Sequence, residues 1–126
     1  MILDKCRDKK EFKELFEDRP MDDGIMDFDF ILNNPYSYYF YGEDDNKLKG
    51  YISVYTDETK KLFLCGASIR KNMADNINAI LTVCKAFNDD MYSDTDKKEA
   101  KICLLRAGFN KLNDTLFVRY KNGKKQ

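Results

Sequence analysis

The chain contains no histidine, and this absence excludes more chemistry than any other feature of its composition. A His-based catalytic triad, a His general base and a zinc-activated water are all ruled out. Cysteine is scarce and scattered: none of the residues forms a CxxC pair, and each has apolar neighbours. Cys6, Cys65, Cys84 and Cys103 are therefore predicted to be reduced core thiols rather than disulfides or metal ligands.

An excess of charge of one sign and long apolar runs are also missing. Lys plus Arg and Asp plus Glu both number 22, so a nucleic acid or an anionic membrane is not the expected partner. No stretch approaches the roughly 18 uncharged residues of a membrane span. The start, "MILDKCRDKKEF", is too acidic and its apolar run too short for a signal peptide. We therefore expect a cytoplasmic protein.

What the chain does contain suits a single globular domain. At 126 residues it can bury about two thirds of its unfolded surface in one core. Hydrophobic residues make up 43% of the chain and include 9 Phe and 8 Tyr, enough to supply that core. We expect one domain over residues 1–120, followed by a solvated basic tail at 121–126.

The first third of the chain predicts a strand and two helices. "MILDKC" suits a short strand, and Asp8 is a possible N-cap for a helix in "KKEFKELFED", which Pro20 closes. The apolar positions of "MDDGIMDFDFILNNP" predict a short second helix, although "DFDF" alternates and also suits an extended chain.

The next third changes character. "YSYYFYG", "KLKGYISVYT" and "KKLFLCGAS" are rich in aromatic and β-branched residues, and short polar turns separate them. This pattern predicts a three-stranded antiparallel meander. After Ser68 the apolar period becomes helical, with a stripe at Met73, Ile77, Ile80, Leu81, Cys84 and Phe87.

The last third predicts a strand, a helix and a hairpin. "DMYS" suits a short strand, and Asp94, Thr95 or Asp96 can cap the helix that Gly108 ends. "FNKLNDTLFVRYK" then suits a hairpin that turns at residues 113 and 114.

This order, β-α-α-β-β-β-α-β-α-β-β, resembles the GNAT (GCN5-related N-acetyltransferase) fold over nearly the whole chain. "KLKGYISV" looks like that family's third strand, and "EAKICLLRAGF" looks like its late helix, which ends in Gly-Phe. The resemblance implies an α+β sandwich, with a mixed, mostly antiparallel central sheet and helices on both faces. Length and ending are similar to small GNAT-like proteins of tailed bacteriophages, which implies the host cytoplasm or the virion as the location.

In the GNAT family, acyl-coenzyme A lies in a splay between the fourth and fifth strands. Its pyrophosphate lies on backbone N–H groups at the start of the third helix, where the helix dipole attracts phosphate. The corresponding residues here are Arg70, Lys71, Asn72, Met73, Ala74 and Asp75. The family needs small residues at two of these positions so that the backbone can approach the phosphates. Counted from Arg70 they are Met73 and Asp75; counted from Ile69 they are Asn72 and Ala74. The bulk of Met73 and the charge of Asp75 predict a degenerate site.

The late helix also departs from the family pattern. Counting back from Gly108 places Leu104 where the family often has a Tyr near the leaving thiolate, and Lys97 where it has an Asn. Neither can play the usual part in catalysis. The remaining catalytic candidates are Tyr92, whose alternative role is core packing, and Glu43, whose alternative role is in a solvated turn.

An acidic cluster borders the region that would be the family's acceptor groove. It can attract a cationic substrate or partner, or it can simply be a solvated face. Its members are Asp22, Asp23, Asp27 and Asp29.

Three functions remain open. The first is a GNAT-like protein with a degenerate acyl-coenzyme A site, for which we expect no cofactor, no metal and a protein partner. The alternative is an active N-acetyltransferase that uses acetyl-coenzyme A. The second alternative is a single-stranded nucleic-acid-binding module, because "KGYISVY" partly matches the aromatic signature of RNA-recognition strands. Its stacking platforms would be Tyr36, Tyr38, Tyr39 and Tyr41.

Overall fold

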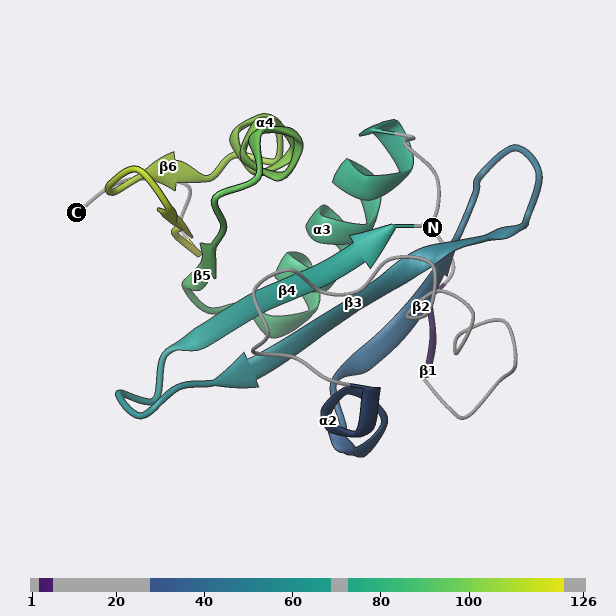
Figure 1. Cartoon of the computed structure of the whole chain (residues 1–126), viewed down its shortest axis with the longest axis horizontal. Helices are drawn as coiled ribbons and strands as arrows, with labels where there is room; N and C mark the ends of the chain where they lie inside the picture. Colours follow the sequence, from purple (N-terminus) through teal and green to yellow (C-terminus); the bar gives the residue numbers. More distant parts are fainter. Residues whose placement is uncertain (1–2, 6–27, 69–72, 122–126) are drawn as a thin grey trace.

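In the computed structural model, the strands among the described residues all belong to one sheet (Figure 1). The structure describes residues 3–5, 28–68 and 73–121, so the first predicted helix lies outside the described residues. The elements are β1 (Leu3–Lys5), α2 (Phe28–Asn33), β2 (Ser37–Tyr41), β3 (Leu48–Thr56), β4 (Leu62–Ser68), α3 (Met73–Phe87), β5 (Met91–Asp94), α4 (Lys98–Arg106), β6 (Asn110–Lys111) and β7 (Leu116–Arg119).

Within the described ranges the sheet has seven strands, in the order β1-β2-β3-β4-β5-β7-β6. Neighbouring strands run antiparallel except β4 and β5, which are parallel. The predicted meander is confirmed as β2, β3 and β4, with Ser53 opposite both Ser37 and Cys65. In the described part of the chain, this is an α+β fold with a mixed, mostly antiparallel open sheet and three helices.

Alternate residues of β3 face opposite sides of the sheet. Ile52 and Val54 pack in the main core with residues of α3 and α4, including Ala79 and Leu104. Residues on the other side of β3 meet α2 and the turn after it, where Tyr55 contacts Phe30 edge-on. Helices therefore cover both faces, as predicted: α2 lies on one, and α3 and α4 lie on the other (Figure 1).

The long helix α3 is confirmed, but the side chains at the centre of its buried face are not the ones of the predicted stripe. Of the predicted stripe, Cys84 is fully buried, while Ile77, Ile80, Leu81 and Phe87 are partly buried flanks. The most buried apolar side chains are Ala79 and Val83. Small side chains let the helix approach the sheet closely, and the larger ones reach the core from the sides.

The start of α4 differs from the prediction. Its N-cap is Lys97, which makes no side-chain capping bond, so capping by Asp94, Thr95 or Asp96 is wrong. Asp94 instead ends β5 opposite Leu116, and the Thr95 hydroxyl accepts a hydrogen bond from the Lys97 N–H at 3.2 Å. The backbone of Asp94 takes part in strand pairing, and the Thr95 hydroxyl closes a turn before the helix begins.

The end of α4 agrees with the prediction. Gly108 has a φ of 91°, a left-handed conformation that favours glycine. The N–H groups of Gly108 and Phe109 donate to the carbonyls of Leu105 and Leu104, which together form a Schellman motif. Leu104 and Phe109 are both buried in the core, so the chain turns directly from α4 into β6.

The C-terminal hairpin turns where the sequence predicts. The Asn113 carboxamide oxygen accepts hydrogen bonds from the N–H groups of Thr115 and Leu116 at 3.0 and 2.9 Å. Of the predicted basic tail, Lys121 lies among the described residues; it is exposed and its N–H donates to Asp90. Among the helices in the described ranges, none has the length and apolar character needed to cross a bilayer.

Candidate functional site

The strands β4 and β5 separate soon after they meet. They pair at Leu62 with Met91 and at Phe63 with Tyr92, whereas β4 pairs with β3 along its whole length. The buried Ser93 hydroxyl then donates to the Leu64 carbonyl at 2.9 Å, so a side chain takes the place of the next ladder bond. Beyond Leu64 the strands diverge, and β5 leads toward α4 (Figure 1).

The candidate cofactor residues stand at the open end of this splay. Arg70, Lys71 and Asn72 lie outside the described residues, and Met73, Ala74 and Asp75 form the first turn of α3. Ala74 points outward, while Asp75 is 4% exposed. The Asp75 carboxylate accepts a hydrogen bond from the Glu43 N–H at 3.3 Å, which ties the start of α3 to the turn between β2 and β3.

The side chains of α3 and α4 close against each other beside that first turn. The Arg106 guanidinium lies 2.9 Å from the Met73 sulfur. Leu104, at the family's tyrosine position, is 3% exposed and belongs to the core. Burial raises the pKa of the neighbouring Cys103 thiol, although a hydrogen bond with Asn76 opposes that shift. The buried face of α4 here offers a leucine and a protonated thiol, and neither is a good general acid at neutral pH.

The two catalytic candidates lie differently relative to the first turn of α3: one is on the opposite face of the sheet, and the other contacts that turn through its backbone. Tyr92 lies on the sheet face opposite α3, where its ring is tilted against that of Phe63 and the Lys61 ammonium is 5.1 Å from its ring centroid. Glu43 is exposed, and its backbone N–H, rather than its carboxylate, reaches Asp75. Of the acidic cluster, Asp22, Asp23 and Asp27 lie outside the described residues, and Asp29 belongs to α2.

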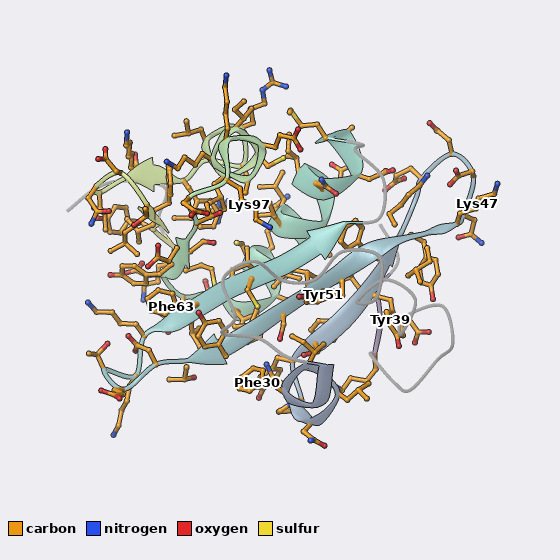
Figure 2. All side chains as sticks on the ribbon, in the orientation of Figure 1. Phe30, Tyr39, Lys47, Tyr51, Phe63 and Lys97 are labelled. Atoms are coloured by element: carbon orange, nitrogen blue, oxygen red, sulfur yellow. The ribbon has the colours of Figure 1, made fainter. Side chains whose placement is uncertain are left out.

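The tyrosines proposed as stacking platforms are buried or partly buried, with one exception. Tyr39 is fully buried, and so is Tyr51 of the "KGYISVY" stretch (Figure 2). Burial also raises the pKa of the half-buried Tyr38, with a further contribution from Tyr36. Tyr36 is the exception at 49% exposed. A base cannot stack on a buried ring, so the rings of Tyr39 and Tyr51 are not accessible for stacking.

An aromatic row crosses the other face of the sheet. Tyr55 stacks on Phe63, and the Tyr92 ring lies tilted beside Phe63, with ring centroids 5.7 and 5.6 Å apart. Phe30 meets one end of the row edge-on, and Lys61 covers the other. Because each ring covers the next, the row joins α2 to β5 as packing.

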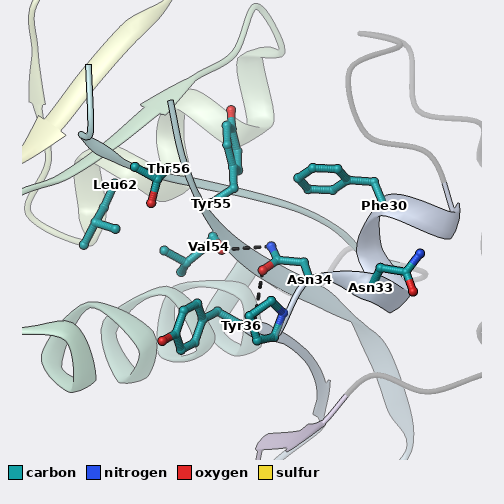
Figure 3. A pocket seen from close by; sticks show the side chains of 9 residues that line it. Phe30, Asn33, Asn34, Tyr36, Val54, Tyr55, Thr56 and Leu62 are labelled. Atoms are coloured by element: carbon teal, nitrogen blue, oxygen red, sulfur yellow. Dashed lines mark hydrogen bonds between the residues drawn. The ribbon is translucent and has the colours of Figure 1, made fainter. Parts of the chain in front are cut away.

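A groove that the sequence did not predict opens at the end of this row. It encloses about 520 Å³ between α2 and the end of β3 (Figure 3). Its lining combines aromatic and aliphatic side chains with short polar ones: Phe30, Asn33, Asn34, Pro35, Tyr36, Val54, Tyr55, Thr56 and Leu62. The abundance of tyrosine around residue 36 was a signal, but sequence alone could not separate the exposed tyrosine from the buried ones.

In the described ranges, no group of three or more Cys, Asp or Glu side chains is placed to hold a metal ion. Comparison of the chain with protein-family models, curated proteins and solved structures finds no match.

Proposed function

We propose that this chain is a GNAT-like scaffold that does not turn over acyl-coenzyme A and acts through contacts with a protein partner. The strand order and the single parallel pair of the described sheet support the GNAT-like part of this proposal. So does the early separation of that pair, because the family's cofactor lies in such a splay.

The observation that most supports weak binding of the cofactor is the buried carboxylate of Asp75. A phosphate at the N-terminus of α3 would lie within about one helical turn, roughly 5 Å, of this group. At an effective dielectric constant of about 20, two unit charges at that distance repel by about 3 kcal/mol. That is about a hundredfold in affinity for each phosphate charge. The carboxylate itself supplies the negative charge that the helix terminus favours.

Leu104 supports the same conclusion from the other side of the splay. Its side chain is part of the core, so a conformational change in α4 would cost apolar burial and would still bring no hydroxyl. An enzyme built on this scaffold would have to protonate its leaving thiolate from another residue.

One observation favours the alternative of an active N-acetyltransferase using acetyl-coenzyme A. Gly66 is exposed on β4, beyond the last pair with β5, where a bare backbone is accessible to a ligand. An accessible backbone at this position favours binding of a ligand beside β4.

Calorimetry with acetyl-coenzyme A tests the proposal. We expect the wild-type chain to bind no more tightly than about 100 µM. Asp75→Asn should bind at least about tenfold more tightly than wild type, because it removes the repulsive charge. The matched control is Asp114→Asn, which removes the same charge from a carboxylate that is 98% exposed and leaves the affinity unchanged.

Micromolar binding by the wild-type chain, with thermal stabilisation on adding the cofactor, would refute the proposal. Transfer of label from a radioactive acyl donor to an amine would establish the alternative.

A further inference from the structure

The edge of β3 carries an unused pair of backbone hydrogen-bonding groups. Val54 donates its N–H to the Tyr36 carbonyl at 3.0 Å, across the side of β3 that faces β2. Residues two apart on a strand direct their N–H and C=O groups to the same side, so those of Thr56 also point there. Strand β2 begins at Ser37, opposite Ser53, and does not reach this position. In the described structure, the backbone groups of Thr56 have no partner on that side.

The Asn34 side chain ends the sheet just before this point. Its amide nitrogen donates to the Val54 carbonyl at 2.9 Å, and its oxygen accepts from the Tyr36 N–H at 3.1 Å (Figure 3). A side-chain amide thus completes the last pair between β2 and β3. The next pair, at Thr56, is left open to the groove.

Exposed aromatic side chains flank the open edge. Phe30 is 41% exposed and Tyr36 is 49% exposed, and both belong to the small set of large apolar residues that the described structure leaves exposed. In Figure 3, Phe30 and Tyr55 lie on one side of Asn34, and Tyr36 lies on the other. Exposed apolar side chains that gather around a groove mark a binding surface more often than scattered ones do.

We propose that this groove binds an extended segment of a partner protein, which adds to the sheet edge at Thr56. The inference rests on the proposed function and names the surface through which the scaffold acts. One donor and one acceptor on a strand edge match an extended peptide backbone, which offers the same pair in the opposite order. The lining contains no charged side chain, so the segment is neutral where it enters.

The register of the added segment follows from the strand geometry. The peptide residue opposite Thr56 places its side chain on the face that holds Val54 and Leu62, because opposite residues share a face. Its two neighbours point to the other face, toward Phe30 and Tyr55. We therefore expect a segment with at least two successive apolar residues.

Nuclear magnetic resonance tests the proposal. The probe is the blocked peptide acetyl-Ser-Val-Phe-Val-Ser-amide, added to the ¹⁵N-labelled full chain. We expect the Thr56 amide proton to move downfield and its solvent exchange to slow at least tenfold at saturation, with a Kd of about 0.1–1 mM. The same peptide N-methylated at its three central residues lacks the backbone donors and should bind at least tenfold more weakly.

Two variants distinguish binding in the groove from nonspecific binding to exposed apolar side chains. Phe30→Ala should weaken peptide binding about tenfold, since it removes one wall. Leu112→Ala is the matched control, because Leu112 is 42% exposed in the turn between β6 and β7 and should leave the Kd unchanged.

Several results would overturn the inference. One is a Thr56 amide resonance that does not move at millimolar peptide, and another is an equal Kd for the N-methylated and unmodified peptides. A third is a Thr56 shift that depends on protein concentration alone, which would identify a second copy of the chain as the occupant. Acetyl-coenzyme A is titrated into the same sample. Cofactor binding with the peptide groove intact would refute the proposed function alone, whereas loss of the peptide result alone would leave the scaffold standing.

Discussion

Replacing Asn34 by alanine tests whether one side chain holds the end of the sheet together. The Asn34 carboxamide donates to the Ser53 hydroxyl at 2.8 Å and to the Val54 carbonyl at 2.9 Å, and it accepts from the Tyr36 N–H at 3.1 Å. Asn34→Ala removes all three bonds. Ser53 keeps its hydrogen bond with the buried Ser37 hydroxyl at 2.7 Å, so the main loss falls on the Val54 carbonyl and the Tyr36 N–H.

The expected cost follows from these groups. A partly buried carbonyl left without a partner costs about 1–2 kcal/mol, and the more exposed bonds cost about 0.5–1 kcal/mol together. The sum is about 1.5–3 kcal/mol of unfolding free energy. For a chain of 126 residues, with an unfolding entropy of about 2.1 cal/mol/K per residue, this lowers the melting temperature by about 6–11 °C. Circular dichroism during heating and urea titration measures both quantities.

The control is Asn33→Ala, one residue earlier, where the side chain is exposed and should change stability by no more than about 0.5 kcal/mol. Equal melting temperatures for Asn34→Ala and Asn33→Ala would refute the reasoning.

Two further predictions concern the core and the strands. A β-carbon at Gly66 would lie 2.6 Å from the Tyr51 carbonyl oxygen, so Gly66→Ala should cost about 1–3 kcal/mol in urea unfolding; Gly42→Ala, whose new atom meets the flexible ends of Asp45 and Lys49, should cost under about 1 kcal/mol. Equal costs would contradict the steric account. Burial raises the pKa of Cys84 to about 11 from 9.0, so stability should fall as the pH rises from 9 toward 11, by about 2–3 kcal/mol relative to Cys84→Ala. A wild-type-to-variant difference that stays constant over this range would show that the thiol does not titrate as expected.

Much of the fold could be predicted because local patterns agree with the final environment. The aromatic and β-branched runs became β2, β3 and β4, and Gly108 ended α4 through a left-handed residue. The buried face of α3 was harder, because periodicity weights large side chains while the closest contact uses Ala79 and Val83. The cap of α4 failed because strand pairing at Asp94, a contact with Leu116 far along the chain, decided where the helix could begin.

The candidate sites could be predicted less well, for a physical reason. The sequence showed that Met73, Asp75 and Leu104 differ from the residue types of the GNAT pattern that the chain resembles. It could not show that the Asp75 carboxylate is buried and accepts a hydrogen bond from the backbone of Glu43. The groove depends on where β2 stops relative to β3, a register difference that a single sequence does not encode locally. Exposure at Tyr36 and burial at Tyr39 follow from that same register.

The two candidate sites differ in whether their backbone hydrogen-bonding groups already have partners. Buried main-chain polar groups must find partners, so a side chain that fills a vacant ladder position removes that position from use by a ligand. At the splay, the first carbonyl of β4 past the last pair with β5 is already bonded to Ser93. At the groove, Asn34 fills the position at Val54, and the following one at Thr56 stays open beside two exposed aromatic rings. A ligand that gains affinity from backbone pairing therefore finds more to bind at the edge of β3 than between β4 and β5, and this is the difference that the proposed function predicts.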